Sequence, residues 1–218
     1  MRERDRGLYD AINKGLDLCT GDWIYVLGSD DEFFDERVLK DLADQGYFDE
    51  EQVVYGNVIL RGDTPWAADG TVYDGPFTLE KLFRTNLCHQ SIFYPRSVIT
   101  RIGRYSEKYP VTADWDYNVH CFARYKFTYV NRIIALFRGG GRSSMADERS
   151  FFRDLPEKVV SYFGLDPEDR SLHRIGSPFF YPVAMYRISG YQKTIKTLES
   201  EIRLLRAALE TKSREGAI

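Results

Sequence analysis

The spacing of apolar residues changes from helical to strand-like near the start of the chain. Apolar residues recur every three or four positions, which predicts an amphipathic helix with the face Leu8, Ala11, Ile12, Leu16 and Cys19. A Thr-Gly-Asp turn at 20–22 ends this pattern. Residues 23–27, Trp-Ile-Tyr-Val-Leu, form an apolar run typical of a buried parallel strand. Ser29-Asp30-Asp31 follows this run, at the strand end where open α/β sheets bind ligands.

Helical and strand-like patterns continue to alternate as far as residue 137. We expect Asp35 to cap a helix that ends near Gly46, and Thr78 to cap a second helix through Phe83. Strands are predicted at 53–60, 86–95 and 127–137, and further helices at 98–102 and from residue 114. This order of elements predicts an α/β fold, in which helices flank a sheet.

The region after residue 147 lacks strand signals and is expected to be helical. Its first helix is predicted between Phe151 and Phe163. A strict heptad seam follows, with Ile188, Tyr191, Ile195, Leu198, Ile202, Leu205 and Leu209. Ile at the a positions and mostly Leu at the d positions favour a parallel coiled-coil dimer, in which Glu201 would attract Arg206 of the partner. The alternative is a helix packed on its own domain, which usually needs a wider apolar stripe.

Composition and charge narrow the class of protein. With 218 residues the chain can form one full domain and an appendage. Its net charge of −3 argues against nucleic acid as a partner. Three scattered cysteines without a CxxC pair indicate reduced thiols in a cytosolic protein. No run approaches the ~20 apolar residues of a membrane-spanning helix, so we expect a cytoplasmic protein, with peripheral membrane association left open.

Two pairs of carboxylates are candidates for chemistry. Asp30 and Asp31 follow an apolar strand, where they suit a hard cation or simply form a turn before the next helix. Asp114 and Asp116 lie near the start of a predicted helix. The helix N-terminus favours a charged carboxylate there, and partial burial would be needed to keep it basic.

Two further motifs are weaker when taken alone. His89 and Gln90 form the polar start of the strand predicted at 86–95, although a single histidine is more often structural than catalytic. The run from Arg138 to Arg142 contains three glycines, which either bring backbone amides to phosphate oxygens or form a plain loop.

The segments Asp5-Arg-Gly-Leu-Tyr-Asp-Ala-Ile-Asn-Lys-Gly15 and Gly28-Ser-Asp-Asp31 resemble the nucleotide-sugar-dependent glycosyltransferases of family 2, and the resemblance continues to about Gly141. It implies a partial GT-A-like, Rossmann-like mixed sheet with a C-terminal helical region and coiled coil. The family's first strands, which carry the pocket for the nucleotide base, are expected to be lacking. We expect a GT-A-like domain at 1–146, a helical extension at 147–185 and a coiled-coil oligomerisation helix at 186–213.

The resemblance also implies roles for particular residues. The family moves a sugar from a nucleoside-diphosphate sugar to a hydroxyl acceptor with inversion, and bacterial surface polysaccharide synthesis is the expected context. Asp114 matches the catalytic base, with Asp116 in reserve, and Asp31 is the expected ligand of Mn²⁺ or Mg²⁺. Nucleotide-sugar contacts are expected from Asp10, Asn13, Lys14, Asp30, His89, Gln90, Arg138 and Arg142.

The absence of the family's first strands leaves three interpretations open. The active protein is longer than this chain, or a partner chain or dimer mate covers the apolar edge that strand 23–27 would expose. In the third, the chain is a catalytically inactive module that acts as an oligomerising scaffold. In the enzyme interpretation, the acceptor is a glycan or a lipid-linked molecule, the loop at 61–76 either lines its site or is an ordinary surface loop, and residues 188–209 join a homodimer.

Overall fold

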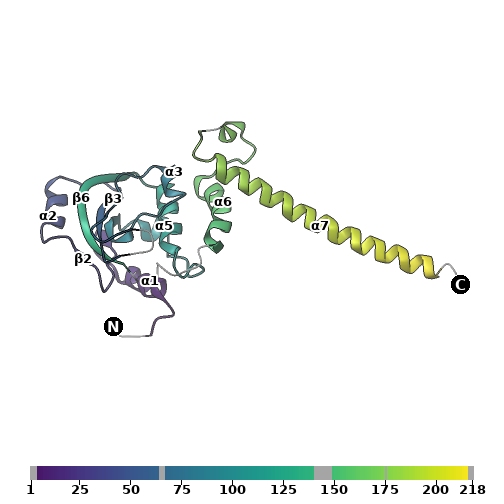
Figure 1. The fold of residues 1–218 in the computed structure, drawn as a ribbon, viewed down its shortest axis with the longest axis horizontal. Helices are drawn as coiled ribbons and strands as arrows, with labels where there is room; N and C mark the ends of the chain where they lie inside the picture. The colour runs from purple at the N-terminus through teal and green to yellow at the C-terminus, as the bar shows by residue number, and fades with distance from the viewer. Residues whose placement is uncertain (1–3, 64–66, 140–148, 175, 216–218) are drawn as a thin grey trace. The chain divides into compact units, whose positions relative to one another are not determined.

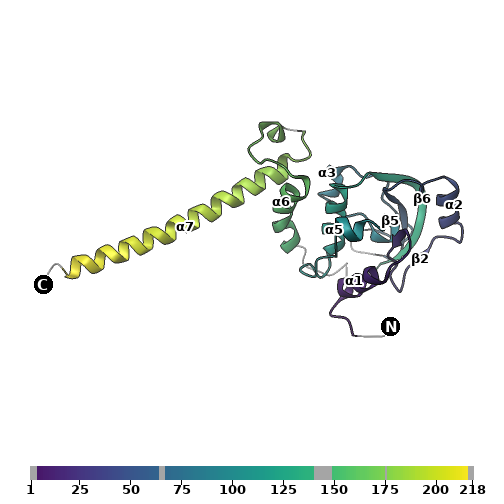
Figure 2. The same ribbon diagram turned by 180° about the vertical axis from the view of Figure 1, so that it is seen from behind.

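The computed structural model divides into two compact units, Met1–Leu155 and Pro156–Ile218. It describes residues 4–63, 67–139, 149–174 and 176–215, and the side chains of residues 206–215 lie outside that description. Figures 1 and 2 show the elements of each unit from opposite sides. Within the described ranges, no helix is both long enough and apolar enough to cross a membrane.

A curled mixed sheet forms the centre of the first unit (Figure 1). Its strands lie in the order β1 (Trp23–Tyr25), β5 (Ile92–Pro95), β3 (Val53–Arg61), β6 (Phe127–Arg138) and β2 (Glu32–Phe33), and β4 (Val72–Tyr73) pairs with β3. Strands β3 and β6 are parallel, whereas the other described pairs are antiparallel. The prediction of an α/β fold with a mixed sheet is therefore confirmed.

Helices cover both faces of this sheet. The described helices of the first unit are α1 (Leu8–Leu18), α2 (Val38–Asp44), α3 (Leu79–Leu82), α4 (Val98–Arg101) and α5 (Ala113–Phe122), with a 3-10 turn, η1, at His89–Ser91. Phe93 of β5 packs in one core cluster with Val38 and Leu42 of α2. The next residue, Tyr94, points the other way and meets Tyr117 of α5 edge to face. Helices α2 and α5 thus lie on opposite sides of the sheet (Figures 1 and 2).

Strand β1 differs from its prediction in direction. The apolar run at 23–27 predicted a parallel strand, but Trp23–Tyr25 pairs antiparallel with β5. In the described part of the sheet, β5 is the single neighbour of β1, so β1 is an edge strand. The predicted parallel direction was wrong. An apolar run indicates that a strand is buried and how long it is, whereas its direction in the sheet depends on the strand with which it pairs.

The strand predicted at 86–95 is shorter than expected. It begins at Ile92, because residues 89–91 form the η1 turn. Both the backbone N–H and the hydroxyl of Ser91 donate to the carbonyl of Cys88, and these bonds close the turn. His89 and Gln90 therefore lie on a turn before the strand.

One helix cap is confirmed and another is corrected. The hydroxyl of Thr78 accepts the backbone N–H of Lys81 at the start of α3, as predicted. Helix α2 has Arg37 as its N-cap, two residues after the predicted Asp35. The Asp35 carboxylate accepts the N–H of Arg37 and two bonds from the guanidinium of Arg132 on β6, and so joins the start of α2 to the sheet.

Helix α1 buries a mixed face rather than the apolar one that its pattern predicted. Its buried residues are Tyr9, Asp10, Asn13 and Leu16, whereas Leu8 is 47% exposed. Asn13 exchanges two hydrogen bonds with the backbone of Tyr105, at 2.9 and 2.8 Å. The helix is therefore attached to the neighbouring turn by a side-chain amide that hydrophobic periodicity does not report.

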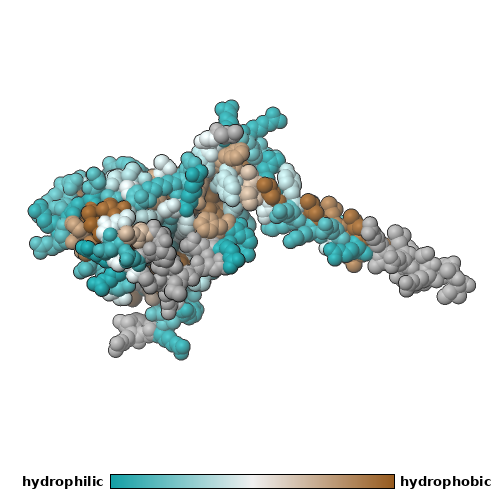
Figure 3. Space-filling model, viewed as in Figure 1, coloured by the Kyte–Doolittle hydropathy of each residue, from teal (hydrophilic) through white to brown (hydrophobic). Residues whose placement is uncertain are grey.

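The described part of the second unit is helical. Helix α6 (Arg149–Phe163) crosses the boundary between the units, η3 spans Arg170–His173, and α7 spans Phe180–Glu215. Arg187 of α7 pairs with Glu168 at 3.3 Å, and the rings of Phe163 and Phe179 are 5.1 Å apart. Beyond Arg187, α7 continues as a long helix with apolar residues at its surface (Figure 3).

Candidate active site

The register of two strands brings the first carboxylate pair and the His-Gln pair to the same end of the sheet. Because β1 and β5 are antiparallel, the residues that follow β1 lie beside those that precede β5. Asp30 and Asp31 follow β1, and His89 and Gln90 precede β5. The hydroxyl of Tyr25, the last residue of β1, donates to the carbonyl of Gln90 at 2.7 Å.

Asp31 connects three segments that are far apart in the sequence. Its Oδ2 accepts the side-chain amide of Gln90 at 2.6 Å, and its Oδ1 accepts the backbone N–H of Arg138 at 3.1 Å. Antiparallel pairing of β2 with β6 places Arg138 there, with Glu32 opposite Leu136. The predicted residues Asp31, Gln90 and Arg138 are therefore in direct contact.

Gly28 allows both carboxylates to lie close to the turn after β1. A Cβ atom at this position would lie 2.5 Å from Oδ2 of Asp31 and 3.2 Å from Oδ1 of Asp30. The carboxylate of Asp30 is exposed and has no hydrogen-bond partner within the described residues. Two neighbouring carboxylates, one of them open to solvent, fit a hard divalent cation whose other ligands are water and substrate phosphates.

The described residues do not supply a complete metal cage of their own. Within them, no group of three or more histidine, cysteine, aspartate or glutamate residues is arranged to hold a metal.

Asp114 lies in the first turn of α5 and accepts hydrogen bonds on both oxygens. Oδ1 accepts the backbone N–H of Trp115 at 2.9 Å and the hydroxyl of Tyr9 at 3.0 Å. Oδ2 accepts the side-chain amide of Asn86 at 3.0 Å, and Nδ1 of His89 is 3.4 Å away. The Asp114 side chain is 14% exposed, so the carboxylate is partly buried but accessible.

His89 and Gln90 make the two carboxylate groups one continuous site. His89 reaches Asp114, while the next residue, Gln90, reaches Asp31. Burial and the nearby Asp114 raise the pKa of Tyr9, so its phenol stays protonated and remains a donor at neutral pH. The site therefore combines an open acidic loop, a His-Gln turn and a carboxylate at a helix start.

The remaining residues that the sequence predicted for the site are Asp116, Asp10, Asn13, Lys14 and Arg142. Asp116 is also in the first turn of α5 and is buried. Asp10 is held by Arg6 and Lys14, each at about 3 Å, and Asn13 bonds to the backbone of residue 105. The structure uses Asp10, Asn13 and Lys14 within and around α1, and their nucleotide-sugar contacts stay a prediction. Arg142 lies outside the described residues.

The sequence did not single out Tyr9, Asn86 or Tyr73 as parts of the site. Tyr9 and Asn86 bond to the Asp114 carboxylate, and the hydroxyl of Tyr73 donates to the carbonyl of Asn86 at 2.6 Å. Asn86 stands at the polar start of the segment that was predicted as a strand, and this position was the one available signal. Tyr73 lies in the predicted loop 61–76, on β4, so this part of the loop supports the site.

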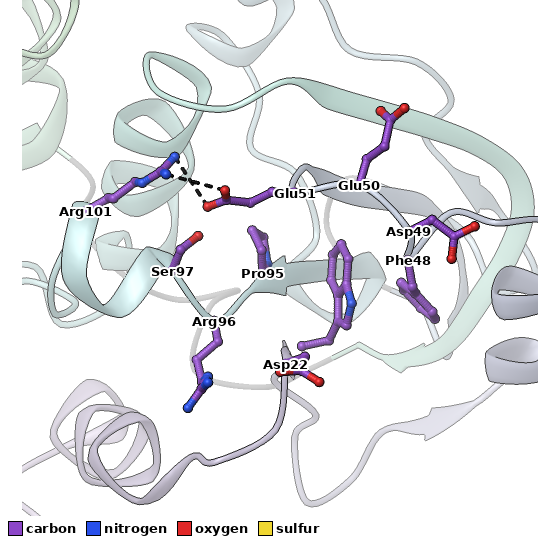
Figure 4. A pocket seen from close by; sticks show the side chains of 10 residues that line it. Asp22, Phe48, Asp49, Glu50, Glu51, Pro95, Arg96, Ser97 and Arg101 are labelled. Carbon is purple, nitrogen blue, oxygen red and sulfur yellow. Dashed lines mark hydrogen bonds and ion pairs between the residues drawn. The ribbon is translucent and has the colours of Figure 1, made fainter.

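An open depression of about 470 Å³ lies elsewhere on the first unit (Figure 4). It is lined by residues at the start of β1 and the end of β5, such as Trp23 and Pro95, and by the acidic segment 49–51. Glu51 is paired with Arg101 at 3.3 Å on its rim. Because Asp30–Asp31 and His89–Gln90 are at the opposite ends of the same strands, this depression is separate from the candidate site.

Comparison with known proteins shows what the sequence is similar to. Residues 1–97 match the family model described as Glycosyl transferase family 2. The chain is 37% identical over 160 residues to the PGL/p-HBAD biosynthesis glycosyltransferases of Mycobacterium bovis (strain BCG / Pasteur 1173P2) and Mycobacterium tuberculosis (strain ATCC 25177 / H37Ra). Each match covers 71% of this chain and 60% of the relative, so the chain spans about three fifths of the length of these curated relatives.

Solved structures show the same fold at low sequence identity. The crystal structure of S. aureus TarS 1-349 in complex with UDP-GlcNAc aligns with a TM-score of 0.56 at 12% identity, and covers 74% of this chain and 48% of that one. The crystal structure of S. aureus TarS 1-349 aligns with a TM-score of 0.55 at 14% identity, and covers 81% and 51%. These likenesses support the GT-A-like fold alone.

Proposed function

We propose that this chain, which resembles glycosyltransferase family 2 over residues 1–97, is part of an enzyme that transfers a sugar from a nucleoside-diphosphate sugar to a hydroxyl acceptor. The single observation that carries the proposal is the position of His89 and Gln90, which touch Asp114 and Asp31 respectively. Donor-side carboxylates and a carboxylate suited to proton abstraction thus lie in one site.

On the donor side, the residues after β1 would hold the diphosphate. Asp31 would bind Mg²⁺ or Mn²⁺, which when bound neutralises charge on the leaving diphosphate. Gln90 and the backbone of Arg138 keep Asp31 in place, and the side chain of Arg138 adds a positive charge at the same end of the sheet. Arg142 is proposed to act with it, and we keep Asp31 as the proposed metal ligand and Asp30 as the neighbour facing the sugar or ribose.

On the acceptor side, Asp114 is the proposed general base. An attacking hydroxyl must lose its proton, which requires a carboxylate within hydrogen-bond reach. Asp114 is partly accessible, whereas Asp116 is 6% exposed, so Asp114 is the better candidate of the two. Direct displacement by the deprotonated hydroxyl would invert the anomeric carbon.

The relatives support a class of acceptor. The mycobacterial relatives are named for PGL/p-HBAD biosynthesis, and we propose a role for this chain in the assembly of a bacterial cell-surface glycan. A glycan or a lipid-linked molecule would be the acceptor, which is compatible with peripheral association at the inner face of the membrane.

Metal-dependent nucleotide binding tests the enzyme proposal. We expect UDP or dTDP to bind in the presence of Mn²⁺, measured by isothermal titration calorimetry, and to lose most of its affinity when chelator removes the metal. Asp30→Asn should weaken this binding, because it removes the exposed carboxylate that is proposed to face the ribose beside the metal ligand Asp31. Asp22→Asn is the matched control, since Asp22 is an exposed acid at the opposite end of β1.

The alternative function is an inactive module that oligomerises. If folded protein binds neither nucleotide at millimolar concentration, the enzyme proposal fails for this chain and the scaffold interpretation gains. Binding that is equally reduced in Asp22→Asn and Asp30→Asn would contradict the assignment of the acidic loop as the donor site.

We also propose that α7 pairs with a second copy of itself through the seam 188–209. The seam residues up to Leu205 are all exposed in the single chain, at 47% to 65%. They follow a heptad spacing. A continuous apolar stripe that faces solvent does not stabilise a single helix, so the spacing indicates a partner that covers it. A second copy with the same stripe would cover it, and the solution mass of the protein tests this pairing.

A further inference from the structure

We propose that a directed chain of hydrogen bonds, from Tyr94 through Asn118 to Asn86, positions the Asp114 carboxylate for proton abstraction. This inference rests on the proposed role of Asp114 as general base. It makes Asn86 a positioning residue. It assigns the same function to the buried residues Tyr94 and Asn118, which do not hydrogen-bond to the Asp114 carboxylate.

Each bond of the chain has one direction. The hydroxyl of Tyr94 donates to Oδ1 of Asn118 at 2.5 Å, and Nδ2 of Asn118 donates to Oδ1 of Asn86 at 3.0 Å. Nδ2 of Asn86 then donates to Oδ2 of Asp114 at 3.0 Å. Because each amide oxygen accepts from the preceding residue, each amide nitrogen faces the next one.

Burial fixes the start of the chain. Tyr94 is 1% exposed and Asn118 is fully buried, so solvent does not lie beside either side chain as an alternative partner. Burial raises the pKa of Tyr94 well above its ordinary value, and the phenol therefore acts as a donor across the physiological range. A neutral donor at the buried end orients every amide toward the carboxylate, and hydrogen bonds in such a series strengthen one another.

Asn86 itself is fixed at two points. Its side chain accepts from Asn118, and its backbone carbonyl accepts the hydroxyl of Tyr73 at 2.6 Å. Asn118 and Asp114 are four residues apart on α5, so they lie on the same side of the helix. The helix therefore carries both the carboxylate and the residue that aims its donor.

The other side chains that contact Asp114 make weaker or shared hydrogen bonds to its carboxylate. The single proton of the Tyr9 hydroxyl is shared, because the carbonyl of Val111 is 2.5 Å away and the Asp114 oxygen is 3.0 Å away. His89 is at 3.4 Å, near the limit of a hydrogen bond. Asn86 is thus the side chain with a full donor directed at Oδ2.

The titratable groups around Asp114 come from several elements. Tyr9 and His89 contact the carboxylate directly. Four further groups are close enough for its charge to raise their pKa values, namely Tyr73, Cys88, Tyr94 and Tyr105. Each variant used to test the inference therefore leaves all of these groups unchanged except the one being tested.

Two substitutions test this series of hydrogen bonds by enzyme kinetics. Asn86→Ala should lower kcat by about 10- to 100-fold with little change in the KM for the donor, because a misplaced base slows the chemical step. Tyr94→Phe keeps the ring but removes the first donor, and should cause a smaller loss of kcat in the same direction. Asn131→Ala is the control, because Asn131 is an exposed asparagine whose recorded partner is Tyr129.

A second measurement does not depend on activity. Side-chain amide protons of Asn86 and Asn118, observed by NMR, should exchange at least about tenfold more slowly than those of Asn131. In Tyr94→Phe the protection of Asn118 should fall. Circular dichroism confirms that each variant is folded before either comparison is made.

The outcomes separate this inference from the proposed function. If the wild-type protein transfers sugar and Asn86→Ala has an unchanged kcat, the positioning role is wrong while the enzyme proposal stands. If the protein is inactive, the enzyme proposal fails. The protection of the side-chain amides still decides whether the series of hydrogen bonds from Tyr94 to Asp114 exists. Fast exchange at Asn86, equal to that of Asn131, overturns the inference in either case.

Discussion

At the scale of single residues, buried polar side chains hold the first unit together where apolar spacing predicted a plain hydrophobic face. Asp10 and Asn13 occupy the buried side of α1, while Leu8 of the predicted face is exposed. Their partners are the backbone and side chains of nearby segments, and the bonds are short. The partners of Asp10 are Arg6 and Lys14 close by in the sequence, whereas the partner of Asn13 is Tyr105, which a repeating pattern cannot reveal because it comes from a distant part of the chain.

The pKa of Asp10 gives a prediction about acid stability. The backbone N–H of Arg6 and the ammonium of Lys14 lower this pKa from 3.8 to about 2. Since the folded pKa lies below the unfolded one, the carboxylate stabilises the fold above pH 4, and this stabilisation is lost as pH falls from 4 toward 2. We expect Asp10→Asn to be less stable than wild type at neutral pH, and the difference to shrink on acidification.

Urea unfolding at a series of pH values measures this difference. Asp17→Asn is the control, because Asp17 lies on the same helix as Asp10 and forms an exposed ion pair with Arg104. A difference that stays constant with pH, or that Asp17→Asn reproduces, would show that the hydrogen bonds of Asp10 are not responsible.

At the scale of elements, hydrophobic periodicity located most helices and strands, and their pairing came from contacts between them. The strand at 53–60 was expected, and β3 spans Val53–Arg61. Its parallel pairing with β6, and the shift of register on either side of Asn57, have no signal in either sequence segment alone. The shift is made possible by Gly56, which approaches β6 more closely than any other residue type could.

Gly56→Ala tests this close approach. A Cβ atom there would lie 2.5 Å from the carbonyl oxygen of Arg132 and 2.7 Å from a side-chain carbon of Ile134. Because backbone cannot move away cheaply, we expect a loss of about 1–3 kcal/mol in the free energy of unfolding. Chemical denaturation measures it.

Gly15→Ala is the matched control, and it should change stability in the opposite direction. Gly15 lies within α1, and no atom is within 4 Å of its added Cβ. Alanine in a helix is favoured over glycine by about 0.5–1 kcal/mol. If both variants lose stability equally, the effect at Gly56 is not caused by its contact with β6.

At the scale of the whole molecule, the two units differ in how their apolar residues are used. The first unit buries large side chains on both faces of its sheet, with Tyr55, Phe93 and Tyr94 all nearly inaccessible. The described seam of α7 in the second unit is exposed instead, including Ile195 and Leu198 near its middle. A stripe of this kind in a single copy is the sequence signature of pairing between helices.

Solution mass decides whether α7 forms a dimer. We expect light scattering to give twice the chain mass for the wild type, and the single mass for Ile195→Asp combined with Leu198→Glu, because two charges in the seam cannot be buried without partners. Leu204→Glu should remain dimeric, since Leu204 is 71% exposed and stands outside the a and d positions. A monomeric wild type, or an equal effect of Leu204→Glu, would contradict the proposed seam.

The sequence alone determined the kind and order of most elements, the heptad seam and the residues able to do chemistry. These features depend on local spacing and on residue type, which the chain carries at each position. Asp30, Asp31, His89, Gln90, Asp114 and Arg138 could be singled out before any contact was known, and the resemblance to glycosyltransferase family 2 supplied their expected roles.

Only the tertiary structure decided that β1 is antiparallel and that Asp31, Gln90 and Arg138 meet. It also decided that Asp114 takes its donor from Asn86. Each of these facts depends on strand register and on residues distant in the sequence. A one-residue change of register would turn every side chain of a strand to the other face, and local patterns do not determine register between distant strands.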